Sequence, residues 1–365
     1  MIRVLHLLDH PAEFEPQRVS GALASGLGAE FAVTRASVGM GGTYRNTVAA
    51  VAGIRRQIKE KAYDVVHAFS AAGLTAAALA GNVALVFTPS PAVRPGTVRW
   101  LRAVQAYRRV EVVCPTSTLR RVLVEHGIGA GTVHLIRPAV DFSRVRKRRD
   151  VELRARLGFG DGDRVILAAG ESTRPAAHGD AAWAAGILHV ADARYKLLLW
   201  GRGPQIGQVA DYRARWPMPD LISVAEERLG RAVEFEELLP AADMIMVTAR
   251  GPVATLPIAM GMASGLPIVS TVTYTVSELL EDRHTALMAP GGKPRLLARR
   301  VLDLEEEPGV QWSIADMART EAFEYFAMSR MLKQYRGVYR QVAEGEPVRV
   351  EEQGAGAGLR FHGRA

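Results

Sequence analysis

Residues 195–204 read YKLLLWGRGP, an apolar run that ends in two glycines one residue apart. Aliphatic and aromatic residues followed by glycine are typical of a buried β-strand that runs into a turn. Gly201 and Gly203 carry no Cβ, so the backbone there can approach another segment or a ligand closely. On its own the glycine pair also fits an ordinary tight turn, and the surrounding segments decide between the two interpretations.

The alternation of short strands with longer amphipathic helices continues on both sides of this stretch. Strands that alternate with helices of this length predict parallel sheets built from β-α-β units. We expect further strands at residues 4–8, 31–36, 64–68, 84–88, 111–114, 164–169, 244–248 and 268–270. We expect helices at residues 18–27, 46–61, 116–126, 181–190, 257–263, 296–304 and 324–342.

The chain of 365 residues is too long for one ordinary core and suits two domains. The charged run Arg144–Asp150 interrupts the alternation, and we interpret it as a solvated linker, with a phosphate-binding patch or a nuclear signal as the alternative. We therefore expect one domain over residues 1–145, a second over 146–323 and a terminal helix over 324–343. Residues 344–365 are polar and rich in glycine, so we expect a disordered tail.

Composition narrows the class of protein. Hydrophobic residues make up 48% and charged residues 23% of the chain, as in ordinary globular domains. The single cysteine, Cys114, excludes an internal disulfide and fits a reducing compartment, so we expect a cytoplasmic protein. The net charge of +8 favours anionic partners such as nucleotides or lipid head groups. No DNA- or RNA-reading motif is present, so we expect no nucleic-acid partner.

A series of short motifs follows in a fixed order along the chain. They are RPAVD at 137–141, RLG at 156–158, LWGRGP at 199–204, AAD at 241–243, GMASGLPIV at 261–269, SELL at 277–280 and ALMAP at 286–290. Each motif is weak alone, but their order and spacing make the sequence, from about residue 64 to 339, resemble the glycosyl transferases group 1. These are retaining, nucleotide-sugar-dependent glycosyltransferases of the GT-B fold.

The resemblance implies two Rossmann-like, doubly wound parallel-sheet domains that face a cleft, with the C-terminal helix returning to the N-terminal domain. A nucleotide sugar would bind the second domain and the acceptor the first. Open α/β sheets bind ligands at the carboxyl ends of their strands, and free amides at the start of a helix suit a diphosphate. The expected donor-site residues are Gly170, Arg174, Gly201, Arg202, Gly203, Thr248, Arg250, Thr255, Leu256 and Glu278, and the expected catalytic residues are Asp9, His10 and His67.

The sequence departs from the family at the positions that carry chemistry. The family's pair of donor-site glutamates corresponds to Pro252 and Met260, and neither side chain can accept a hydrogen bond from a sugar hydroxyl through a carboxylate. The family's Arg and Lys, which clamp the diphosphate, correspond to Glu171 and Ala177. In the family's His-x-His motif the second histidine is replaced by Phe69. Arg174 is the candidate substitute for the lost clamp.

Three functions remain open on these residues. The first is transfer of a sugar, with retention, from a nucleotide sugar to a glycan, lipid or small-molecule acceptor. No Asp-x-Asp stands at a strand end, so we expect no metal, and no cofactor besides the donor substrate. The alternative is a catalytically inactive GT-B protein that binds a partner or scaffold, because the Glu pair and the Arg/Lys clamp are replaced. A nucleotide-sugar epimerase ranks last, because the expected cleft offers few carboxylates and histidines.

Membrane contact is a separate hypothesis. The segment Arg94–Arg109 carries arginines beside Trp100 and Tyr107, a composition that suits peripheral contact with an anionic lipid surface. A surface helix with one buried stripe explains the same pattern.

Overall fold

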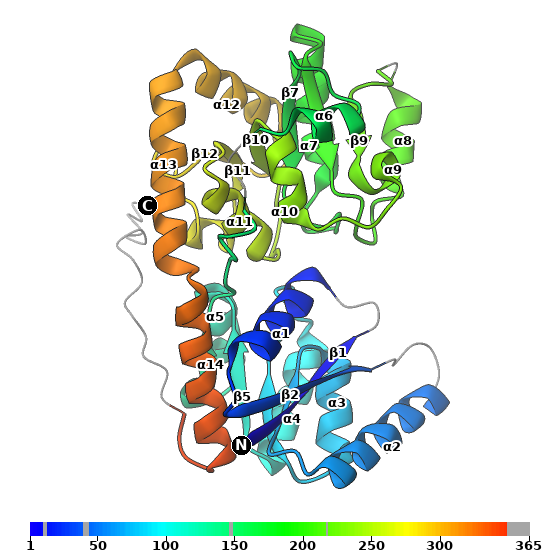
Figure 1. The fold of residues 1–365 in the computed structure, drawn as a ribbon, viewed down its shortest axis with the longest axis vertical. Helices are drawn as coiled ribbons and strands as arrows, with labels where there is room; N and C mark the ends of the chain where they lie inside the picture. The colour runs from blue at the N-terminus through cyan, green and yellow to red at the C-terminus, as the bar shows by residue number, and fades with distance from the viewer. Residues whose placement is uncertain (10–12, 39–43, 146–148, 217, 349–365) are drawn as a thin grey trace. The chain divides into compact units, whose positions relative to one another are not determined.

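The structure is a computed structural model that describes all residues except 10–12, 39–43, 146–148, 217 and 349–365 (Figure 1). The chain forms two compact units. The first comprises Met1–Ala139 and the described residues from Met328 onward, and the second comprises Val140–Ala327. Each unit is an α/β layer structure built on its own sheet.

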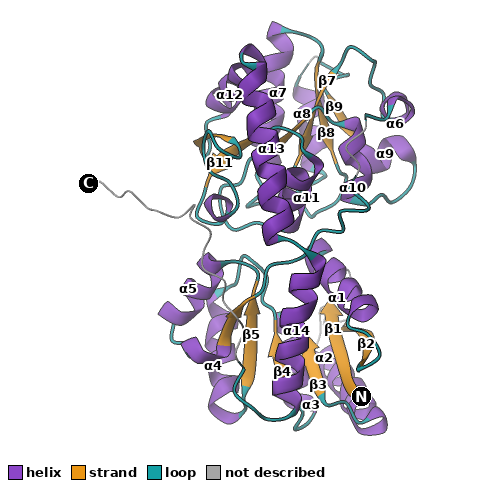
Figure 2. Cartoon of the chain, turned by 60° about the vertical axis from the view of Figure 1, so that its left-hand side comes forward, coloured by secondary structure: helices purple, strands orange, loops and turns teal. Residues whose placement is uncertain are grey.

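The first unit contains a six-stranded parallel sheet in the order β2-β1-β3-β4-β5-β6. Its strands are β1 (Ile2–Asp9), β2 (Phe31–Val38), β3 (Val65–Ala68), β4 (Ala84–Phe87), β5 (Val110–Cys114) and β6 (Val133–Leu135). The connecting helices are α1 (Phe14–Gly26), α2 (Tyr44–Lys61), α3 (Ala71–Ala80), α4 (Pro95–Tyr107), α5 (Ser117–Glu125) and the 3-10 turn η1 (Ala130–Thr132). The helices flank the sheet, as β-α-β crossovers require (Figure 2).

The second unit contains a six-stranded parallel sheet in the order β12-β11-β10-β7-β8-β9. Its strands are β7 (Arg164–Ala168), β8 (Tyr195–Leu199), β9 (Ile222–Val224), β10 (Met244–Val247), β11 (Ile268–Val272) and β12 (Leu287–Pro290). Its α-helices are α6 (Val151–Arg156), α7 (His178–Ala191), α8 (Gln208–Arg215), α9 (Ala225–Leu229), α10 (Phe235–Leu238), α11 (Leu256–Ser264), α12 (Pro294–Glu306) and α13 (Pro308–Tyr325). The 3-10 turns are η2 (Leu239–Ala241) and η3 (Val276–Glu278).

Local sequence explains where many of these elements begin. Thr116 caps α5 by accepting a hydrogen bond from the Leu119 N–H at 3.1 Å, and Ser70 caps α3 through the Gly73 N–H at 3.0 Å. Such side-chain acceptors satisfy backbone donors that have no partner in the first helical turn. The predicted alternation of strands and helices, and the parallel sheets, are confirmed.

The predicted long helix over residues 324–342 is wrong in its extent. The chain instead forms α13 and then α14 (Met328–Ala343), with a break at Phe326 and Ala327. The Val140 N–H donates to the Phe326 carbonyl at 3.0 Å, and Ala327 forms a β-bridge with Val140. These contacts with a distant segment take the chain out of the helix at that point.

Helix α14 returns to the first unit, as predicted, and lies across its sheet (Figure 2). Its buried side chains, among them Met331, Tyr335 and Tyr339, pack with residues of β1, β3 and β4 in one core cluster. Beyond α14, Val348 is buried and Arg109 donates to the Gly345 carbonyl at 3.0 Å. Within the predicted tail, Val348 is therefore packed against the first unit, residues 344–347 are exposed, and 349–365 lie outside the described residues.

A buried hydrogen-bonded cluster lies under α14. The Tyr339 hydroxyl is 2.6 Å from His67 Nδ1 and 3.0 Å from His6 Nε2. The remaining ring nitrogens lie 2.9 Å from the hydroxyls of Ser20, beside His6, and Thr88, beside His67. Burial lowers the pKa of His6 to about 3, helped by the nearby Arg35, and lowers the pKa of His67 well below its usual value. Both imidazoles are therefore neutral in the folded protein.

Acid is expected to destabilise the first unit through these two histidines. Above pH ~6.5 such a histidine is neutral in both the folded and the unfolded chain, and it has no effect on the pH dependence of stability. Below pH ~6.5 the unfolded chain takes up a proton that the folded chain does not, and this favours unfolding. Stability should therefore fall as the pH drops from about 6.5 toward 3, by up to about 1.4 kcal/mol per pH unit for each of His6 and His67.

Urea unfolding at pH 7, 6 and 5, with hydrogen exchange of the β1 and β3 amides as the probe, measures this loss of stability. Equal stability of the first unit at pH 7 and pH 5 would contradict the assignment of two neutral histidines.

Candidate functional site

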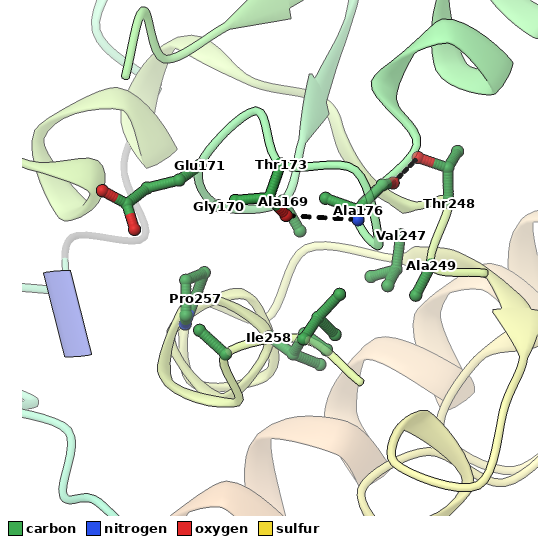
Figure 3. Close-up of a pocket in the computed structure, with 12 residues that line it drawn as sticks. Ala169, Gly170, Glu171, Thr173, Ala176, Val247, Thr248, Ala249, Pro257 and Ile258 are labelled. Atoms are coloured by element: carbon green, nitrogen blue, oxygen red, sulfur yellow. Dashed lines mark hydrogen bonds between the residues drawn. The ribbon is translucent and has the colours of Figure 1, made fainter. Parts of the chain in front are cut away.

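A pocket in the second unit lies at the carboxyl ends of β7 and β10, beside the start of α11 (Figure 3). The cavity volume of this pocket is about 40 Å³. The lining residues are Ala169, Gly170, Glu171, Thr173, Ala176, Val247, Thr248, Ala249, Val253, Ala254, Pro257 and Ile258. Strand ends and a helix N-terminus meet here, which is where open parallel sheets bind ligands.

Glycine is required in the loops that build this pocket. Gly203 has φ +108°, and a Cβ there would lie 2.5–2.8 Å from the backbone of Ser172. Gly170 has φ +80°, and a Cβ there would lie 3.2 Å from Cγ of Pro257, at the start of α11. Gly201 has φ +111°, and a Cβ there would lie 3.0 Å from Cβ of Glu226. The glycines of the 201–203 turn therefore permit close packing of protein segments.

The loop after β7 is joined to the loop after β8 through the backbone of Ser172. The Ser172 N–H donates to the Arg202 carbonyl at 2.7 Å, and the Gln205 N–H donates to the Ser172 carbonyl at 2.9 Å. These two hydrogen bonds hold the two loops together where the backbone of Gly203 passes the backbone of Ser172.

Two of the arginines expected to bind the donor form ion pairs with carboxylates. Arg202 lies 2.9 Å from Glu226 and 3.8 Å from Glu234. Arg250 makes two bonds with Asp180, at 2.7 and 2.5 Å. Paired in this way, both guanidinium groups brace the loops and have much of their charge offset locally.

Thr248 also has a structural role in this conformation. Its hydroxyl is buried and donates to the Ala176 carbonyl at 2.7 Å, and the neighbouring Arg250 N–H donates to the Pro175 carbonyl at 2.8 Å. Both bonds hold the far end of the loop after β7.

A buried Ser–His pair completes the support of this loop, and the sequence analysis missed it. His178 Nδ1 lies 2.9 Å from the Ser172 hydroxyl, and Nε2 donates to the Ala169 carbonyl at 3.2 Å. Because Nε2 carries the proton, Nδ1 accepts from Ser172. Burial lowers the pKa of His178 to about 4. No spacing rule in the sequence marks a serine and a histidine six positions apart as a pair.

The remaining expected donor residues occupy three different settings. Arg174 is exposed on the turn of the loop after β7, and Glu171 lines the pocket. Thr255 and Leu256 are buried at the start of α11. Glu278 is half-buried in η3 and does not line the pocket.

Each unit matches a family of glycosyltransferases. Residues 10–144 match the family described as Glycosyltransferase Family 4, and residues 163–307 match the Glycosyl transferases group 1. The first unit thus carries a Glycosyltransferase Family 4 domain, and the second unit carries a glycosyl transferases group 1 domain.

The relatives of this chain are distant. N-acetyl-alpha-D-glucosaminyl L-malate synthase of Bacillus anthracis is 22% identical over 229 residues, which are 60% of this chain and 58% of that protein. The matched region thus spans little more than half the length of this curated relative.

Solved structures of similar fold include Anabaena HepE in complex with UDP and glucose. It has a TM-score of 0.77 at 15% identity, covering 93% of this chain and all of that one. A glycosyltransferase from Rickettsia africae has a TM-score of 0.75 at 15% identity, covering 94% of this chain and 99% of the other. At these identities the likeness shows the GT-B fold alone.

Of the three expected catalytic residues, the structure describes His67 and Asp9. His67 is fully enclosed, and its ring nitrogens face Tyr339 and Thr88, so in this conformation it cannot reach a ligand. Asp9, at the end of β1, accepts a hydrogen bond from Ser70 at 2.5 Å and is half-buried. His10 lies outside the described residues.

Among the described residues, no helix combines the length and apolar character needed to cross a bilayer. No group of three or more His, Cys, Asp or Glu side chains there could hold a metal ion.

Replacing Gly203 should disrupt the candidate site. Gly203→Ala forces a Cβ into the Ser172 backbone and strains a residue at φ +108°, so we expect a loss of about 2 kcal/mol or more of stability in the second unit. Gly207→Ala is the matched control, because nothing lies within 4 Å of a Cβ there. Thermal unfolding and hydrogen exchange of residues 170–177 measure the effect. Equal stability of both variants would refute the close crossing.

Proposed function

We propose that this chain transfers a sugar, with retention, from a nucleotide-sugar donor to a glycan, lipid or small-molecule acceptor. The observation that carries the proposal is the pocket at the ends of β7 and β10, closed on one side by the start of α11. A helix N-terminus at that position favours a bound anion. The match of both units to glycosyltransferase families supports the same conclusion.

The donor is proposed to bind the second unit with its phosphates near Gly170 and the first turn of α11, at Thr255 and Leu256. Arg174, exposed on the adjacent loop, would approach the diphosphate and take the place of the family's clamp. UDP is the first nucleotide to test, because the similar HepE structure contains UDP and glucose. No resident metal or cofactor is included in the proposal.

The acceptor is proposed to bind the first unit, where Asp9 lies at the carboxyl end of β1. The Bacillus anthracis relative is named for a product in which the sugar is joined to L-malate, a small hydroxy acid. That name supports an acceptor that carries a hydroxyl group.

A peripheral membrane location on the cytoplasmic side is part of the proposal, and α4 is the observation that favours it. One face of α4 buries Val98, Leu101 and Val104. Its opposite side exposes arginines together with Trp100, 36% exposed, and Tyr107, 87% exposed. Exposed arginines and aromatic rings on one helix face suit the head-group layer of anionic lipid.

Part of the basic segment seen in the sequence has another role. Arg108 donates to the carbonyls of Ala77, Ala78 and Val83, and Arg109 pairs with Glu111 at 2.7 Å. The membrane-facing charge is therefore proposed to come from Arg99 and Arg102, which are exposed on α4.

The second candidate function is that of a catalytically inactive GT-B protein that binds a partner. The ion pairs of Arg202 and Arg250, together with the enclosed His67, favour it, because each takes an expected ligand group away from a substrate. Nucleotide binding separates the two candidates.

Under the transferase proposal, a nucleotide sugar should raise the melting temperature of the chain. A ligand at about 100 times its Kd adds roughly 2.7 kcal/mol to the folded state. A thermal-shift series with UDP, GDP, ADP and their sugar conjugates identifies the nucleotide. Arg174→Ala should reduce the shift, whereas Arg55→Ala, an exposed arginine of the first unit, should retain it. No shift with any nucleotide up to millimolar concentration would favour the inactive binding protein.

The membrane proposal is tested by charge reversal on α4. Arg99→Glu with Arg102→Glu should weaken co-sedimentation with anionic vesicles by roughly tenfold or more, since each basic residue near such a surface contributes about 1 kcal/mol. Arg55→Glu with Arg56→Glu, on the exposed side of α2, is the matched control. Wild-type protein that stays in the supernatant with anionic vesicles would remove this part of the proposal.

A further inference from the structure

A pocket in the first unit lies at the carboxyl ends of four neighbouring parallel strands. The residues that directly follow β3, β4, β5 and β6 all line it, and they are Phe69, Thr88, Pro115 and Ile136. Residues of α1 and α14 line it as well. Open α/β sheets bind ligands at this edge, so the pocket lies where the proposed acceptor is expected on the first unit.

The backbone around this pocket offers few hydrogen-bond donors, because proline is the commonest residue of the lining. The prolines stand at positions 16, 89, 91, 115 and 138. A proline has no backbone N–H, so none of these positions can donate to a ligand. The neighbouring side chains of Val19, Phe69 and Ile136 are apolar and buried. A glycan, with a hydroxyl on most of its carbons, would leave many of its oxygens without a partner here.

The hydroxyl groups of the lining are already hydrogen-bonded within the protein. Thr88 Oγ1 lies 2.9 Å from His67 Nε2, and the Tyr335 hydroxyl forms a hydrogen bond with Thr88. The Ser90 hydroxyl donates to Glu13 at 3.4 Å. A ligand that needs no hydrogen bond from the pocket leaves all of these bonds in place.

The charges of the lining do not suit an anionic acceptor. Neither arginine nor lysine is among the described residues that line the pocket. Glu15, its one charged lining residue, is 7% exposed and interacts with another group of the protein. A carboxylate or phosphate on the acceptor would lose water here and gain no cation, which costs free energy.

The size of the pocket and its link to α4 indicate which apolar ligand it takes. The cavity volume is about 20 Å³, room for about one or two groups of the size of a water molecule or a methylene. A narrow hydrocarbon chain fits such a space, whereas an aromatic ring is too broad. The loop that supplies residues 88–91 leads into α4, which exposes Trp100 and Tyr107 on its proposed membrane side. A lipid could therefore reach the pocket from the head-group layer while most of it stays in the membrane.

We propose that the acceptor is a long-chain lipid alcohol, and that this proline-lined pocket holds the part of its hydrocarbon chain next to the hydroxyl. In the transfer, the lipid hydroxyl oxygen forms the bond to the anomeric carbon of the sugar. The bond from that carbon to the diphosphate oxygen breaks, and the hydroxyl proton goes to the departing nucleoside diphosphate. This inference rests on the proposed glycosyltransferase function and names its acceptor class.

Methyl NMR of the full chain tests the binding. Octan-1-ol, maltotriose and L-malate are each titrated into protein labelled at the methyl groups of Ile, Leu and Val. Octan-1-ol at millimolar concentration should shift the signals of Val19 and Ile136, because both side chains line the pocket. Maltotriose and L-malate should leave these signals in place.

Two variants that obstruct the pocket give the binding a specific control. Pro91→Glu places a carboxylate beside the bound chain and should weaken octan-1-ol binding roughly tenfold or more. Pro95→Glu, at an exposed position outside the lining, makes the same change nearby and should bind like wild type. Val19→Phe fills the cavity and serves as the second obstructing variant if Pro91→Glu does not fold.

The same three compounds are then offered as acceptors, together with the nucleotide sugar that stabilises the chain. Transfer to octan-1-ol that Pro91→Glu or Val19→Phe reduces supports the inference. Transfer to maltotriose or L-malate alone overturns the lipid acceptor and leaves the glycosyltransferase function standing, as does octan-1-ol binding that both variants retain. Octan-1-ol that binds without receiving sugar also overturns the inference. Failure of every nucleotide sugar to stabilise the chain overturns the proposed function instead.

Discussion

The backbone crossing at Gly203 and Ser172 is the constraint on which the second unit's candidate site depends. A Cβ at Gly203 would lie within 2.8 Å of three Ser172 backbone atoms, so the two loops can meet only because glycine stands there. Once they meet, the segment after β7 is held at Arg202, Gln205 and His178. The pocket beside Gly170 takes its shape from this fixed loop, and the position of Glu171 follows from it.

The first unit depends on a comparable buried contact. A single phenol, Tyr339, reaches two imidazoles, which fixes α14 against β1 and β3. Buried polar groups must be paired, and here each of the two rings has a hydroxyl on both sides. His67, an expected catalytic residue, therefore serves the packing of the terminal helix.

Much of the fold could be predicted from the sequence, because strand and helix periodicity is a local property. The division between α13 and α14 could not, since periodicity continues through it and the bridge to Val140 comes from far along the chain. The donor site shows the same limit. Arg202 stands in a family motif and Arg250 follows a predicted strand, but the carboxylates that pair with them, Glu226 and Asp180, are brought there by folding. Glu171, in contrast, is assigned to the donor site only because it aligns with the family's clamp arginine, and it does line the pocket.

The central claim is that the second unit binds a nucleotide at the ends of β7 and β10 although the family's clamp is missing. A crystal structure of the chain grown with UDP tests it most directly. We predict that the diphosphate lies beside Gly170 and the first turn of α11. An empty pocket at saturating nucleotide, or UDP bound elsewhere on the chain, would contradict it.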